Sequence, residues 1–432
     1  MPLIDKASSR DQNPFPDMSP KPIEIRVSQP GRTAAGAEEE RSFPRYEGPA
    51  FLSNGFRPFF LGAALFTGVA VPFWVFIFAG TSGSGVLYAP REWHVHEMLY
   101  GFLPAVMTGF LLTAIPNWTG RAPLRGNALL SLWLLWLAGR LLLAWPSVGP
   151  ITAALVDGAF LVVLAAFVWR EIVAGGSRSQ VPIALVISLY AGANVLFHVL
   201  ALRGATTDVP EHLAVALIML LLTMIGGRVT PNFTREWLAQ EQLAERVAAF
   251  SRFDGLSIVL VLVAAVGWIV QPDSLIAGAT LVAAGLVNLS RLIRWSGWLA
   301  WREPLVLILN IGYGWLALSL LALGGSILGA GVPRANAVHV LSTGAVGVMT
   351  LAIMTRASLG HTGRPRHAGP VTVLIYVLVN AGAMLRVFVP TPDSPTVWTY
   401  GMLGLAAAGW SGAYLLFALT YGPFLVRPSL EE

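Results

Sequence analysis

Five of the seven histidines lie near the ends of long apolar segments of the chain: His94, His96, His198, His212 and His339. Neutral imidazole is the commonest metal ligand in proteins. Because the chain has no cysteine, thiolate sites are excluded, and a set of histidines then suits haem iron or copper. For a single histidine the alternative is a hydrogen bond between helices, so the depth of each histidine decides between the two interpretations.

A repeat indicates that three of these histidines lie at one depth. His96, His212 and His339 are each followed by a threonine 11 or 12 residues later, and then by a loop that carries an arginine. They belong to the second, sixth and tenth apolar segments, which predicts three units of four helices about a pseudo-threefold axis. Helices of the same parity enter a membrane from the same side, so we expect all three histidines near its outer surface.

His94 and His198 extend this set at the same level. His94 precedes His96 by two residues, which is about 200° around a helix, and His198 ends the fifth segment, a short loop away from His212. Ionisable groups inside a membrane are costly and are functional by default. Five histidines at one level therefore favour metal binding over five separate hydrogen bonds.

Two arginines end apolar segments at the same outer level, Arg140 in the third segment and Arg386 in the eleventh. A planar guanidinium group binds carboxylates bidentately, so haem propionates suit both residues as partners. The alternative is that both side chains extend to lipid phosphates.

Two glutamates adjoin the helix-start histidines, Glu97 after His96 and Glu211 before His212. Each could orient an imidazole or relay protons in a catalytic role. Each could equally be a first-turn acid that the helix dipole favours.

The elements that must position these residues are apolar segments of about 20 residues, each long enough to cross a ~30 Å hydrocarbon core. Of all residues, 55% are hydrophobic and only 12% are charged, whereas soluble proteins have about 25% charged residues. This composition excludes an ordinary soluble enzyme. The sequence predicts an all-α polytopic membrane protein with 12 transmembrane helices near 59–80, 95–116, 127–146, 150–170, 181–202, 211–229, 254–271, 274–293, 304–324, 335–356, 371–389 and 397–420.

The twelve-helix domain is predicted over 51–424, between a disordered cytoplasmic tail at 1–50 and a cytoplasmic C-terminal tail at 425–432. Arginines concentrate in the loops after the even-numbered helices, which predicts that both termini are cytoplasmic. That distribution also accounts for the pI near 9.7, so no nucleic-acid partner is expected. The inner loop at 230–253 is predicted to hold a helix, either amphipathic on the membrane surface or a solvated linker.

Several motifs together resemble the NnrS family, from about Phe51 to Tyr421. They are SNGFRPFF (53–60), HVHEM (94–98), PNWTGR (116–121), NVLFH (194–198), GGRVTPNFTR (226–235) and MTRASLGHTGR (354–364). The resemblance implies a polytopic inner-membrane protein of denitrifying or nitrosatively stressed bacteria, with haem and copper as cofactors and a role in the nitric oxide response. One position departs from the family pattern, because Asn310 stands where a histidine is expected in the ninth helix. A metal site that used that histidine would lack a ligand here.

The layout in three units also resembles the catalytic subunit of haem–copper oxidases, in which histidines of the second and tenth helices bind haem. That resemblance, at the level of the fold, assigns His96 and His339 as axial ligands of a b-type haem. His94, His198 and His212 then remain for copper or a second haem. The sequence has no adjacent histidine pair on the seventh helix, so an oxidase-type dinuclear centre is not expected.

Three functions remain open at this point. The first is a haem- and copper-binding inner-membrane protein that binds or turns over nitric oxide, as an oxidoreductase or otherwise, and protects against nitrosative stress. The second is a transporter of an anion or a metal without redox chemistry, although transporters are usually built from two related halves rather than thirds. The third is a haem- or copper-binding sensor or assembly factor without turnover. The sequence does not indicate an electron donor.

Overall fold

The computed structural model describes residues 46–80, 86–391 and 396–430, and its helices confirm the predicted all-α membrane protein. Twelve helical spans are long and apolar enough to cross a membrane, so the chain is a multi-pass membrane protein. Most of the expected N-terminal tail, 1–45, lies outside the described residues. At the other end, the last helix continues slightly into the expected tail.

Nine spans consist of one long helix each. These are α1 (Phe56–Phe78), α4 (Gly126–Leu143), α5 (Pro150–Ala174), α6 (Val181–Leu202), α9 (Arg252–Val270), α10 (Leu275–Arg294), α11 (Pro304–Ile327), α14 (Pro370–Val387) and α15 (Val397–Val426). The other three spans are composite. They are α2 (Pro90–His96) with η3 (Glu97–Phe102) and α3 (Leu103–Thr119), α7 (Asp208–Leu221) with η6 (Leu222–Gly226) and α8 (Gly227–Gln240), and α12 (Arg334–His339) with η9 (Val340–Val346) and α13 (Gly347–Gly360).

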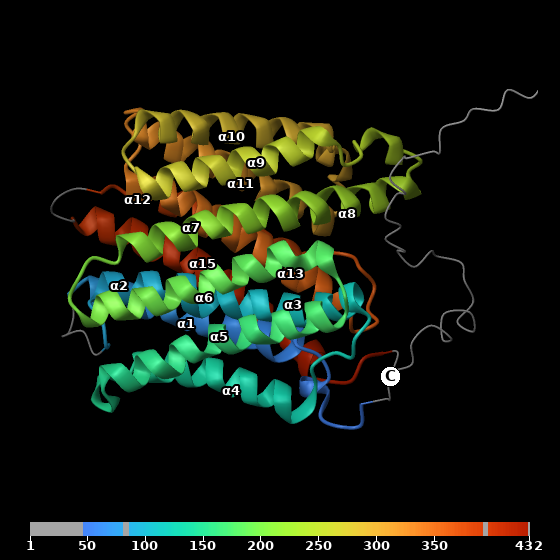
Figure 1. Cartoon of the computed structure of the whole chain (residues 1–432). Coiled ribbons are helices and arrows are strands. Elements are labelled where there is room, and N and C mark those ends of the chain that lie inside the picture. The colour runs from blue at the N-terminus through green and yellow to red at the C-terminus, as the bar shows by residue number, and fades with distance from the viewer. Residues whose placement is uncertain (1–45, 81–85, 392–395, 431–432) are drawn as a thin grey trace, which may run out of the picture. The chain divides into compact units, whose positions relative to one another are not determined.

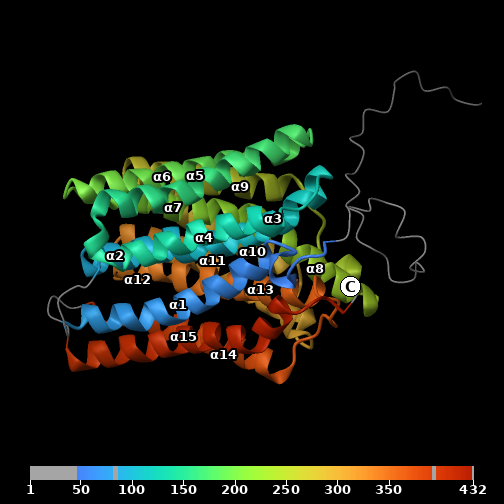
Figure 2. The ribbon, with the colours of Figure 1, turned by 90° about the horizontal axis from the view of Figure 1, so that it is seen from below.

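The composite spans that carry His96 and His339 lie in the interior of the bundle. The most apolar stretch of each is 72% buried, against 33% for α4, α9 and α14. Figure 1 shows α2, α7 and α12 starting at the same end of the bundle, and Figure 2 gives the perpendicular view. On the outer helices, large side chains such as Leu155, Leu262 and Leu405 remain exposed, as expected where lipid replaces water.

All three composite spans contain a π-helical segment, and no other span does so within the described residues. η3 and η9 begin directly after His96 and His339. A π segment leaves main-chain carbonyls without their regular helical partner, and neighbouring side chains use them: Tyr190 donates to the Leu99 carbonyl at 2.5 Å, and Trp136 donates to the Gly101 carbonyl at 2.9 Å. These shared segments agree with the sequence repeat, while the threefold axis stays a prediction.

The sixth span is longer than expected. The helix predicted within 230–253 is present up to Gln240, where it continues the sixth span as α8, and the short helix η7 (Ala244–Arg246) follows. Contacts with the tenth span hold this extension in place, because Glu236 pairs with Arg356 at 3.1 Å and the Arg356 guanidinium lies 3.7 Å from the centre of the Phe233 ring.

Candidate metal centre

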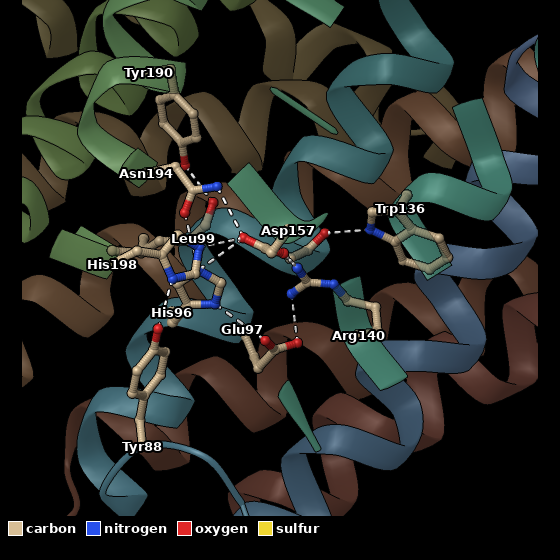
Figure 3. Close-up of polar contacts among 11 residues, drawn as sticks. Tyr88, His96, Glu97, Leu99, Trp136, Arg140, Asp157, Tyr190, Asn194 and His198 are labelled. Atoms are coloured by element: carbon tan, nitrogen blue, oxygen red, sulfur yellow. Dashed lines mark hydrogen bonds and ion pairs between the residues drawn. The ribbon is translucent and has the colours of Figure 1, made fainter. Parts of the chain in front are cut away.

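Six polar residues form a buried cluster at the end of the bundle where α2 begins. The cluster is formed by His96 from α2, Glu97 from η3, Arg140 from α4, Asp157 from α5, and Asn194 and His198 from α6, and all six are at most 4% exposed. We call it the carboxylate–imidazole cluster, and Figure 3 shows its side chains pointing toward one another. Polar groups this deep in an apolar bundle are costly unless they are paired or bind a ligand.

Asp157 lies at the centre of the carboxylate–imidazole cluster. Its Oδ2 accepts hydrogen bonds from His198 Nε2 at 2.8 Å and from Asn194 Nδ2 at 3.0 Å, and it lies 3.2 Å from His96 Nε2. Its Oδ1 forms an ion pair with Arg140. Both imidazoles therefore place a ring nitrogen within 3.2 Å of the same carboxylate oxygen, although the hydrogen bond of His96 Nε2 is with Asn194 Oδ1 at 3.0 Å.

Glu97 supplies the second carboxylate of this cluster. Its Oε2 accepts from Arg140 Nη1 at 2.6 Å, and its Oε1 lies 3.2 Å from His96 Nδ1. The cluster thus holds two carboxylates and one guanidinium, and one negative charge remains. A proton on an imidazole or a bound cation supplies the missing positive charge, because an uncompensated buried charge is strongly destabilising.

His198 is fixed on both sides of its ring. Asp157 can only accept, so Nε2 carries the proton of the neutral ring, and Tyr88 then donates its hydroxyl proton to Nδ1 at 2.7 Å. Burial, and next the charge of Glu97, raise the pKa of Tyr88, so the phenol stays a donor. A metal ion at His198 would take the place of the Nε2 proton, and Tyr88 would keep the ring oriented.

The donor atoms of His96, Asp157 and His198 suit a metal ion. One atom from each residue lies within 4.8 Å of the other two. Two imidazoles and a carboxylate are a donor set for copper, iron or zinc. The cluster therefore offers three ligands of the right type from three different helices.

Two glycines let the helices approach closely enough to build this cluster. A Cβ at Gly139 would lie 2.8 Å from Asp157 Oδ1 and 3.2 Å from Asp157 Cα, so only glycine allows α4 to pack this closely on α5. A Cβ at Gly101, in η3, would collide with the Arg140 guanidinium. A larger residue at either position would therefore displace the side chain of Asp157 or Arg140.

A second group pairs His94 with His339, from the second and tenth spans. Their ring centroids lie 6.5 Å apart, and the ring planes are within 8° of parallel. His339 Nδ1 donates to the Ala335 carbonyl at 2.6 Å, which leaves the Nε2 lone pair free. His94 stacks on Trp74 with 3.9 Å between centroids, and its buried Nδ1 has no hydrogen-bond partner among the described residues.

His94, His339 and Arg386 line one cavity of about 80 Å³, together with Trp74 and Trp410. We call it the histidine-pair cavity. Arg386 contacts Asn336 Oδ1 at 3.5 Å, and no carboxylate of the described residues forms an ion pair with it. Its guanidinium therefore keeps donors for an anionic group in the cavity.

The remaining predicted residues lie outside both groups. His212 packs against Trp268 with 4.5 Å between ring centroids. Glu211 pairs with Arg91 at 2.8 Å and accepts from Thr207 at 2.6 Å. Asn310 donates to Thr234 Oγ1 and to the Val306 carbonyl, both at 3.1 Å, so its side chain serves the contact between α11 and α8.

The structure therefore divides the five predicted histidines into two groups and one separate residue. His339 faces His94 rather than His96, and His96 faces Asp157 and His198. Asp157 was not among the metal-binding residues predicted from the sequence. The sequence did contain a signal for a functional role of Asp157, because it is an ionisable residue inside a 25-residue apolar helix. Such residues are functional by default.

A comparison with curated proteins finds no match. A family model described as NnrS protein matches residues 50–429. That range includes every residue of the carboxylate–imidazole cluster and of the histidine pair. Since the match covers nearly the whole chain, the protein belongs to the NnrS family.

Proposed function

We propose that this protein is a haem- and copper-binding inner-membrane protein that binds or turns over nitric oxide and so protects the cell from nitrosative stress. The observation that carries the proposal is the buried group of His96, Asp157 and His198, whose donor atoms converge within 4.8 Å. Membership of the NnrS family supports the link to nitric oxide. Lipid surrounds the protein, both termini lie in the cytoplasm, and no nucleic acid is involved.

Copper belongs, in this proposal, in the carboxylate–imidazole cluster. His96, Asp157 and His198 provide two nitrogens and one oxygen, and imidazole is a good ligand for copper. The cluster also has one negative charge more than its guanidinium balances, so a cation completes it. Glu97 and Arg140 surround the ligands and hold them in place, and Glu97 can accept a proton from His96 Nδ1.

Haem belongs, in this proposal, at the histidine-pair cavity, where His94 and His339 would hold it in place of the pair first expected, His96 and His339. The two ring centroids lie 6.5 Å apart. His339 keeps the lone pair of Nε2 and the buried Nδ1 of His94 has no partner among the described residues, so each ring has a nitrogen that could bind a metal. The free donors of Arg386 suit a propionate.

When bound, the haem and the copper would supply one-electron redox chemistry. The chain itself orients the ligands. The Ala335 carbonyl fixes the tautomer of His339, Trp74 holds the plane of His94, and Tyr88 holds His198. Glu211 lies outside both groups and is paired with Arg91, so we assign it no contact with either metal.

Metal analysis together with an optical spectrum of the purified protein tests this proposal. We expect copper, and a haem absorption that changes on reduction and again on addition of nitric oxide. The His212→Ala variant is the matched control, because His212 lies outside both groups and its loss should leave both metals bound. A colourless protein without metal would overturn the proposal. Consumption of nitric oxide in the presence of a reductant separates turnover from binding alone.

A further inference from the structure

A second, partly open pocket of about 100 Å³ lies among the three composite spans and shares lining residues with the histidine-pair cavity. Its walls are formed by apolar side chains of the second, fifth, sixth and tenth spans, among them Val106, Met107, Phe110, Ile187, Leu221 and Met349. None of the described side chains in its wall carries a charge. We call this cavity the apolar chamber.

The one hydroxyl group in the lining of the apolar chamber, that of Thr350, is not available to bind a water molecule. Thr350 Oγ1 is already engaged, because it donates to the Val346 carbonyl at 2.7 Å and shares a hydrogen bond of 2.7 Å with Tyr414. A buried water needs about two to four polar partners, and apolar cavities on the order of 150 Å³ stay dry and accept benzene or xenon. The chamber is therefore suited to small apolar molecules.

Three residues line both the apolar chamber and the histidine-pair cavity: Leu103, Ile218 and Val346. They come from the second, sixth and tenth spans respectively, one from each member of the sequence repeat. Leu103 begins α3 directly after η3, and Val346 ends η9. Each of the two π segments thus ends at this boundary, and these three residues are shared by the walls of both spaces.

We propose that the apolar chamber is a binding site for one small apolar gas molecule, and that the ring of Leu103, Ile218 and Val346 is its passage to the histidine-pair cavity. A diatomic gas fits a cavity of this volume and gains contacts there without giving up hydrogen bonds. The identity of the gas as nitric oxide rests on the proposed function. The chamber as a gas site rests only on its shape and lining.

Xenon binding tests the site without reference to any metal. The purified protein is pressurised with xenon, and its structure is determined with the anomalous signal of the gas. We expect one strong xenon position enclosed by Val106, Ile218 and Met349, and its loss in the chamber-filling variant Val106→Phe. Xenon absent from the chamber of the unchanged protein, or present only on lipid-facing surfaces, would overturn the inference.

The passage is tested by the rate at which nitric oxide changes the optical spectrum of the reduced protein after rapid mixing. We expect Ile218→Phe to slow this reaction by about tenfold, equivalent to ~1.4 kcal/mol of added barrier. The starting spectrum of each protein is recorded as well, because Ile218 also lines the histidine-pair cavity. The matched control Ile311→Phe lies on an exposed face of α11 and should react at the unchanged rate. Equal rates in all three proteins would contradict the passage. A colourless protein would refute the proposed function and leave the xenon experiment able to decide on the chamber.

Discussion

Asp157 holds the carboxylate–imidazole cluster together, since both histidines and Arg140 contact its carboxylate. The Asp157→Asn variant keeps the size of the side chain and removes its charge. We expect the copper content to fall to background, because the metal loses its carboxylate ligand, and the stability to fall only modestly, because Arg140 keeps its ion pair with Glu97. Metal analysis and thermal unfolding measure both effects.

The matched control for this variant is Asp273→Asn. Asp273 forms an ion pair with Arg334 on an exposed surface, where such pairs contribute at most about 1 kcal/mol. The Asp273→Asn variant should therefore keep its copper. Retained haem absorption in Asp157→Asn would show that the fold persists, and an unchanged copper content in that variant would refute the assigned ligand set.

Tyr88 is predicted to act through His198 rather than on the metal directly. The Tyr88→Phe variant removes the hydroxyl that donates to His198 Nδ1 at 2.7 Å. Partners that orient a metal-binding histidine affect metal affinity by about 10–100-fold, and we expect a loss of copper affinity in that range. Because burial and the charge of Glu97 raise the pKa of Tyr88, the wild-type affinity should not fall as pH rises through the ordinary tyrosine range. A copper titration at neutral and at alkaline pH measures both effects, and equal affinity in wild type and variant would contradict the role.

At the scale of residues, the sequence identified the histidines but not their partners. The two-residue spacing of His94 and His96 correctly indicated different faces of one helix. Which face meets the tenth span depends on how the second span is rotated in the bundle, and a spacing does not contain that information. The resemblance to oxidases favoured His96 as the partner of His339. In the structure, the second span is rotated so that His94 faces His339 instead.

At the scale of elements, close packing of α4 on α5 decides whether Asp157 can reach Arg140. The Gly139→Ala variant places a methyl group 2.8 Å from Asp157 Oδ1 and 3.2 Å from its Cα. Since the second contact is with main chain, the helices must separate, and we expect a loss of about 1–3 kcal/mol in stability together with loss of copper.

The control for this variant is Gly192→Ala in α6, where an added Cβ meets nothing within 4 Å. Alanine favours a helix over glycine by about 1 kcal/mol, so the control should be at least as stable as the wild type. Thermal unfolding of the two variants in the same detergent, with copper analysis, makes the comparison. Equal behaviour of the two would show that the approach of α4 to α5 does not matter to the site.

The helical spans were predictable because length and hydropathy suffice to recognise a membrane helix. The π segments were not, because one extra residue in a helical turn leaves no distinct apolar pattern. A helix within 230–253 was predictable from the apolar spacing, but its continuity with the sixth span as α8 was not. Its apolar spacing is helical in either case, but contacts of Glu236 and Phe233 with Arg356 join these residues to the sixth span.

At the scale of the whole molecule, the arginine-rich loops predict the orientation in the membrane. A reporter enzyme that is active only in the cytoplasm should be active when fused after Glu432, and inactive when fused in the loop near Arg203, which follows an odd-numbered span. Activity at both positions, or the reverse result, would contradict the orientation. Seven of the spans found in the described residues lie between the two fusion points, and this odd number makes the fusions report opposite sides.

The same bundle brings the two groups of histidines to one end and places them on different faces of α2. The carboxylate–imidazole cluster uses α2, η3, α4, α5 and α6, whereas the histidine pair joins the second and tenth spans. The central claim is that these groups are two separate metal sites. It follows that each can be emptied without the other.

Metal content and the haem spectrum of two single variants, His198→Ala and His339→Ala, test this claim most directly. We predict that His198→Ala loses copper and keeps the haem absorption, and that His339→Ala loses the haem absorption and keeps copper. Loss of both metals in each variant, with the protein still folded, would contradict the account.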